Sequence, residues 1–291
     1  LSTIYGIKKM QLSNPLAGHF RQPSIFLKLP SGGKYWVPNS LILNATGEIG
    51  VMPMTAKDEL MLKTPDALLN GQAVVSVLES CMPNILNGWE VPNIDVDALL
   101  IAIRLATYGE NMDTTVKIGG EEATYTLDLR VLLDQLQSSI SWEEKVQVSE
   151  DMTVYVRPLP YRALSKASIE TFETQRIMNV VNDEKLEQEK KVEIFKESFN
   201  KLTEVTIGII ADSIYKIETA EGAVTETEYI KEFIENCDRE IFNKVKDHLD
   251  MLKERNTLKP LRVKATQEMI EKGAGEEVDV PIVFDAANFF G

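Results

Sequence analysis

The chain has 291 residues, of which 44% are hydrophobic and 26% are charged. This composition is typical of a globular protein and excludes a fibrous or wholly disordered chain, and the length allows a sizeable core. The formal net charge of −14 makes nucleic acid and anionic membranes poor partners, because a summed negative field repels them. No run of 18 apolar residues occurs, so no membrane-spanning helix is expected.

The charge is unevenly distributed along the chain. Residues 1–47 carry five basic and no acidic side chains, whereas the remainder has 26 basic and 45 acidic ones. This basic arm could lie against the acidic body of its own chain, reach an acidic partner, or bind phosphate. Its candidate partner-binding residues are Lys8, Lys9 and Arg21.

Residues 24–37 have the pattern of a β-hairpin. Apolar side chains alternate with other residues up to Leu29, and the sequence SGGK at residues 31–34 supplies a turn. Two further short strands are predicted at residues 41–43 and 49–52.

The next segments are predicted to be helical. Thr55 and Asp58 have the spacing of a capping box, in which each side chain accepts from a backbone N–H of the other residue. After a proline, helix is expected again up to residue 81. A clearer helix is predicted with Asp95 as its N-cap and Gly109 as its terminator.

Two β-hairpins follow. Residues 116–129 predict the first, with its turn at the pair of glycines 119–120. After a short helix, residues 145–148 and 153–157 predict the second.

Residues 158–256 are predicted to be almost wholly helical. Two helices, over residues 184–217 and 225–252, are expected to form an antiparallel hairpin, because only residues 218–224 join them. Thr225 and Glu228 predict a capping box for the second helix. The pair could contact only itself or also a neighbouring chain. Apolar residues recur in it at spacings of mostly three or four: Phe195, Phe199, Leu202, Val205, Ile209, Ile230, Ile234, Cys237, Ile241, Val245 and Leu252.

The last part of the sequence returns to strand. Strands are predicted at residues 261–263 and 278–284, followed by Phe289 and Phe290. These two aromatic side chains either cover the protein's own core or enter a pocket on a partner, because exposed apolar residues near a chain end are costly unless covered. Both are candidate partner-binding residues.

These elements together predict the α+β fold class, with short antiparallel hairpins packed on helices and a long antiparallel helical hairpin in the C-terminal half. Four segments are expected: a basic arm and hairpin at 1–47, an α+β domain at 48–157, a helical region at 158–256, and C-terminal strands with a Phe-Phe tail at 257–291.

No constellation with catalytic chemistry stands out. Neither of the two histidines, His19 and His248, lies in a zinc hydrolase motif such as HExxH. The two cysteines lie 156 positions apart and form no CxxC motif. We therefore predict no catalytic, cofactor-binding or metal-binding residue and no small-molecule substrate. An enzyme with an unrecognised carboxylate site is the remaining alternative. Trp36, close to a predicted turn, is a further candidate for partner binding, since its amphipathic ring suits an interface.

Several segments resemble the baseplate hub proteins of T4-type contractile-tailed bacteriophages. The resemblance covers about the first 130 residues and the last dozen. It rests on an ordered set of segments: TIYGIKK at 3–9, FLKLPSGGK at 26–34, PMTAKDE at 53–59, KTPDALLNG at 63–71, DVDALLIAIR at 95–104 and FDAANFFG at 284–291.

The same resemblance bears on metal binding. Members of that family often carry a CxxCG-type knuckle in the hairpin after the helix that starts near Asp95, and sometimes near the C-terminus. This chain has no cysteine at residues 117–121 or 264–275, so no structural zinc is expected.

The resemblance implies a non-enzymatic late protein in the tail baseplate of the virion, assembled in the host cytoplasm. Its implied partners are other baseplate and tail proteins, with further copies of itself as an additional candidate. An assembly chaperone for the baseplate hub that is absent from the mature virion is the alternative.

Overall fold

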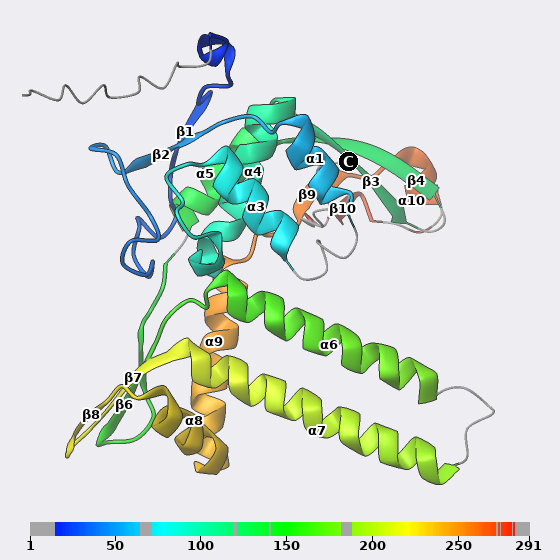
Figure 1. Cartoon of the computed structure of the whole chain (residues 1–291). Coiled ribbons are helices and arrows are strands. Elements are labelled where there is room, and N and C mark those ends of the chain that lie inside the picture. The colour runs from blue at the N-terminus through cyan, green and yellow to red at the C-terminus, as the bar shows by residue number, and fades with distance from the viewer. Residues whose placement is uncertain are drawn as a thin grey trace, which may run out of the picture.

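The computed structural model describes residues 15–64, 71–118, 121–139, 141–181, 188–271, 273, 275–280 and 282. The described chain is a mixture of helices and small antiparallel sheets, as predicted (Figure 1). Two groups of elements are visible. The first lobe lies at the top of Figure 1, and the second lobe lies below it and carries a pair of long helices that extends to one side.

The first lobe combines short strands with helices that pack around one core. Its elements are η1 (Ala17–His19), β1 (Ile25–Lys28), β2 (Glu48–Val51), α1 (Ala56–Leu62), α3 (Gln72–Cys81), η2 (Gly88–Glu90), α4 (Asn93–Tyr108), β3 (Asn111–Ile118), β4 (Glu121–Asp128), α5 (Leu129–Ser139), β9 (Leu261–Lys264), α10 (Gln267–Glu271) and β10 (Glu277–Val280). The predicted hairpin at residues 116–129 is confirmed as β3 and β4, and the predicted strand near residue 262 pairs with β10.

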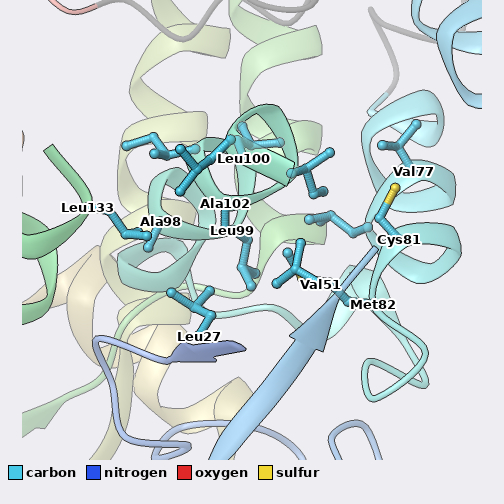
Figure 2. Close-up of a cluster of buried hydrophobic side chains, with 14 of the residues drawn as sticks. Leu27, Val51, Val77, Cys81, Met82, Ala98, Leu99, Leu100, Ala102 and Leu133 are labelled. Atoms are coloured by element: carbon cyan, nitrogen blue, oxygen red, sulfur yellow. The ribbon is translucent and has the colours of Figure 1, made fainter. Parts of the chain in front are cut away.

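Helix α4 is the centre of this lobe. Its residues from Ala98 to Ile103 are all buried, so the helix is covered on every side by α3, α5 and the strands β1 and β2 (Figure 2). Gly109 ends the helix at φ 91°, as predicted, since glycine enters this region without strain. The predicted N-cap is wrong: the helix begins at Asn93, and Asp95 lies inside its first turn.

The predicted hairpin at residues 24–37 does not form. Strand β1 pairs instead with β2, in the register Leu27 to Ile49. The reason lies in the turn, where Gly32, Gly33 and Tyr35 all have positive φ, at 63°, 81° and 68°. Three left-handed residues in four positions redirect the chain away from β1, so residues 35–37 join no strand.

The second lobe is built on a four-stranded antiparallel sheet in the order β5-β6-β7-β8. A second hydrophobic core joins this sheet to the helices and includes Val154, Ile210, Ile217, Ile234 and Val245. The elements of the lobe are β5 (Lys145–Gln147), β6 (Met152–Val156), α6 (Tyr161–Val181), α7 (Gln188–Ser213), β7 (Ile214–Thr219), β8 (Gly222–Val224), α8 (Thr227–Asn236) and α9 (Arg239–Asn256).

A long antiparallel helical hairpin exists in the C-terminal half, as predicted, but α7 pairs with α6 and not with the helix predicted at residues 225–252 (Figure 1). Residues 214–217, expected to end the first helix, and the connection at 218–224 form β7 and β8 instead, and β7 pairs with β6. The capping box expected at Thr225 also fails to form, because Glu226 is the N-cap of α8 and accepts from the Thr225 N–H.

The apolar pattern predicted from Ile230 to Leu252 spans two helices. Four of its six residues are buried, and Cys237 and Ile241 are half-buried. Helix α8 stops at Cys237, and Asp238 then caps α9 by accepting from the Ile241 N–H at 2.9 Å. The chain therefore turns between the two helices, and both can cover the sheet.

The two lobes are tied together by main-chain and side-chain hydrogen bonds. The carboxylate of Glu144 accepts from the hydroxyl of Tyr35 in the first lobe at 2.8 Å and from that of Tyr215 in the second at 3.0 Å. The Asn93 N–H donates to the Leu159 carbonyl at 2.8 Å. Burial and the Glu144 carboxylate raise the pKa of Tyr215 to about 12, so this bridge keeps its protons at neutral pH.

Arg21 anchors the start of the described chain to the first core. Its guanidinium donates to the Pro53 carbonyl at 2.6 Å, to the Ser80 carbonyl at 2.7 Å and to the buried Asp58 carboxylate at 3.2 Å. Asp58 also forms the predicted capping box with Thr55. Burial opposes ionisation of Asp58, but the hydrogen bonds from Thr55 and Ser80 and the charge of Arg21 outweigh it and lower the pKa.

A second anchor fixes the loop that replaces the predicted hairpin. The fully buried Asp95 carboxylate accepts from the Ser31 N–H at 2.8 Å, from the Ser31 hydroxyl at 2.6 Å and from the Trp36 indole N–H at 2.8 Å. Burial raises the pKa of Asp95 to about 6, although these hydrogen bonds oppose the shift. Asp95 therefore holds the loop on α4.

Removal of the Arg21 side chain should destabilise the first lobe. We expect Arg21→Ala to lower the free energy of unfolding by about 3 kcal/mol, because it leaves the buried Asp58 carboxylate without its counter-charge. Arg21→Lys should recover only part of this loss, since an ammonium cannot reproduce the fork of hydrogen bonds. Chemical denaturation measures both values, and a loss below about 1 kcal/mol for Arg21→Ala would contradict the anchor.

The raised pKa of Asp95 predicts a pH dependence of stability. Because the folded state binds this proton more tightly than the unfolded chain, protonation stabilises the fold as the pH falls below about 6. Between about pH 7 and pH 5, the wild type should therefore gain about 1 kcal/mol relative to Asp95→Asn, which cannot titrate. Asp97, whose pKa burial also raises to about 6, is common to both proteins. A difference that is constant with pH in denaturation experiments would refute this prediction.

Candidate interaction surface

Helices α6 and α7 extend from the second lobe as an antiparallel pair (Figure 1). With 21 and 26 residues, they are about 30 and 40 Å long. Their bases are covered by the rest of the lobe. Leu164 of α6, Ile209 and Ile210 of α7 and Leu249 of α9 line one cavity of about 290 Å³, so α9 crosses one face of the pair.

Farther from the base, small polar residues are buried where large apolar ones would be expected. Thr174 of α6 and Ser198 of α7 are buried. The Thr174 hydroxyl donates to the Glu170 carbonyl of its own helix at 2.7 Å, so its polar group is satisfied without a partner on α7. Small side chains at this level let the two helices approach closely and leave the bulky residues on other faces.

The bulky apolar residues of α7 are exposed. Val192, Phe195 and Phe199 are 65%, 52% and 60% exposed. At 3.6 residues per turn they fall on one side of the helix, in line with Ile210, which is buried in the second core. The apolar face thus continues from the core into a region that no described part of the chain covers.

A groove of about 560 Å³ lies at the base of this apolar face. Its floor includes Thr203 and Thr206, whose hydroxyls donate at 2.9 Å to the Phe199 and Leu202 carbonyls of α7 itself. These threonines therefore present their methyl groups. The groove is lined by Phe199, Leu202, Thr203, Thr206, Ile207, Ile234, Glu235, Cys237, Arg239 and Phe242.

The charged residues of α7 lie mainly on the opposite face. Lys201 pairs with Glu173 of α6 at 3.6 Å. Helix periodicity places the following residues on the side away from Phe195: Glu193, Glu197, Lys201 and Glu204. Together α6 and α7 have seven basic and seven acidic residues, so the pair is neutral in a chain of net charge −14.

The sequence predicted six partner-binding residues, and the structure describes two of them, Arg21 and Trp36. Lys8, Lys9, Phe289 and Phe290 lie outside the described residues. Arg21 and Trp36 are both engaged within the chain, one with Pro53, Asp58 and Ser80 and the other with Asp95. Of the predicted site residues that the structure describes, neither Arg21 nor Trp36 belongs to the exposed face of α7.

The sequence indicates the apolar face of α7 but not that part of this face is exposed. The spacing of Phe195 and Phe199 correctly indicates one helix face. The same spacing predicts a second helix as the cover of this face, and the helix it indicates, at residues 225–252, is not the one that pairs with α7. The small residues Thr174 and Ser198 are the signal that could have separated the two faces, because they mark the contact between α6 and α7.

The exposed face of α7 has the composition of a protein interface. Exposed aromatic side chains beside an apolar groove are typical of protein interfaces. Within the part of the chain that the structure describes, no three His, Cys, Asp or Glu side chains gather in a way that could hold a metal ion. The described helices also include none that is both long and apolar enough to cross a membrane.

Comparison with known proteins adds the identity of the family. Residues 22–272 match the family model described as T4 bacteriophage base plate protein. No curated protein and no solved structure matches the chain. The match spans most of the chain and includes the whole second lobe with the α6–α7 pair, and all of the first lobe except η1 and β10. The chain therefore belongs to the family of T4 bacteriophage base plate proteins, and it is a structural component of a phage tail baseplate.

Proposed function

We propose that this baseplate component acts at the hub, without enzymatic activity, and binds neighbouring baseplate and tail proteins through the apolar face of α7. The observation that carries the proposal is the exposure of Val192, Phe195 and Phe199 on a helix pair that extends from the fold. Large apolar side chains in such a position are costly in water and favourable when a partner covers them. The basic arm and the Phe-Phe tail supply further contacts in this proposal, and assembly takes place in the host cytoplasm.

The same face also suits a hub assembly chaperone. A neutral helix pair with exposed aromatic residues could cover an apolar surface of a tail protein during assembly and then leave the particle. The two functions differ in where the protein is found at the end of assembly. A permanent subunit is present in purified virions at a symmetric copy number, whereas a chaperone is present only in the lysate.

The exposed face should be needed for assembly and not for folding. We expect the double variant Phe195→Ser with Phe199→Ser to fold normally and to reduce incorporation into baseplates at least about tenfold, because aromatic side chains dominate most protein interfaces. Quantitative mass spectrometry of purified particles and of infected-cell lysate measures incorporation, and circular dichroism checks the fold.

A matched control is available in the first lobe. Leu60 of α1 is also exposed, and Leu60→Ser should be incorporated like the wild type. Wild-type incorporation of the Phe195 and Phe199 double variant would contradict the proposal. If the wild-type protein is abundant in the lysate and missing from purified particles, the proposed function as a hub subunit is wrong and the chaperone function takes its place.

A further inference from the structure

The apolar face of α7 has a symmetric arrangement of large and small residues around Phe199. Val192 and Phe195 stand seven and four positions before Phe199, and both are large and exposed. Thr203 and Thr206 stand four and seven positions after it, and both are small and line the groove. On a helix, all five positions lie on the same side. The protruding half and the hollow half of the face are thus equally far from Phe199.

An antiparallel second α7 fits this arrangement. If a two-fold axis passes close to Phe199, Phe195 of the partner subunit lies over Thr203, and Val192 of the partner subunit lies over Thr206. Phe195 and Thr203 are eight residues apart, or about 12 Å along the helix, so each copy offers one projection and one hollow to the other. Such a contact is self-complementary and closed, as a two-fold dimer requires.

Charge also favours a second copy at this place. Two chains of net charge −14 repel each other over most of their surface, but the α6–α7 pair is neutral. A two-fold antiparallel contact brings the same flank of both α7 helices together. The groove itself is lined by one acidic and one basic residue, Glu235 and Arg239, so it does not repel a neutral helix pair.

We propose that a second copy of this chain binds the apolar face of α7, with the two α7 helices antiparallel and Phe195 of each copy in the groove of the other. This inference rests on the proposed function, since it names the first partner of the same surface. The resulting dimer presents two first lobes, one on each side of the paired helices, to the rest of the baseplate.

The oligomeric state of the full chain tests this pairing. Sedimentation velocity over a range of concentrations should show a dimer for the wild type and for the control Leu60→Glu. Phe195→Thr removes the projection, and Thr203→Phe fills the hollow. Each should raise the dissociation constant at least about tenfold. The double variant Phe195→Thr with Thr203→Phe exchanges the two features and should restore the dimer, because a large residue again faces a small one.

The outcomes separate this inference from the proposed function. A wild type that stays monomeric up to about 100 µM, while Phe195→Ser with Phe199→Ser still blocks incorporation into baseplates, would overturn the pairing and leave the proposed function intact. If the double variant Phe195→Thr with Thr203→Phe has a dimer dissociation constant as high as those of the single variants, the antiparallel register is wrong. Restoration of the dimer by the exchange would support the pairing, because no contact with a different partner predicts it.

Discussion

The buried carboxylate of Asp95 is the constraint on which the arrangement of the first lobe depends. It sits in the first turn of the most deeply buried helix and accepts three hydrogen bonds from the loop that contains Ser31 and Trp36. A buried carboxylate is tolerated only when such donors surround it. The loop is therefore held against α4, and its neighbour Tyr35 is positioned to reach Glu144 at the start of the second lobe. One polar cluster thus connects the first core to the junction of the lobes.

In the second lobe, the hydrophobic core covers only the base of the α6–α7 pair. This core ends where α9 crosses the base of α6 and α7, and beyond that point the helix pair is held by small side chains such as Thr174 and Ser198. Beyond that point the large apolar residues Val192, Phe195 and Phe199 of α7 are left on an outer face. This is the reverse of an ordinary helical hairpin, in which the large residues meet between the helices. A protein of a symmetric assembly can use such a face, because its partner supplies the missing cover.

Much of the local structure was predictable from short-range chemistry. The capping box of Thr55 and Asp58, the end of α4 at Gly109 and the β3–β4 hairpin all formed as expected, because each depends on a few neighbouring residues. The errors arose where a distant partner decided the outcome. Residues 214–219 are apolar enough to continue α7, yet they form β7 because β6 offers an open strand edge. The exposure of Phe195 was missed for the same reason, since the spacing of apolar residues along α7 does not show that no other helix of the described chain covers it.

The sequence by itself therefore determined the fold class, the Thr55 capping box, the end of α4 at Gly109 and the family to which the chain belongs. The tertiary structure alone decided which helices pair, where β1 finds its partner, and which apolar residues stay in contact with water. The physical reason is that periodicity identifies an apolar face but not the surface that covers it. Coverage depends on how α9 crosses α6 and α7, and that crossing is set by contacts between residues that are far apart in the chain.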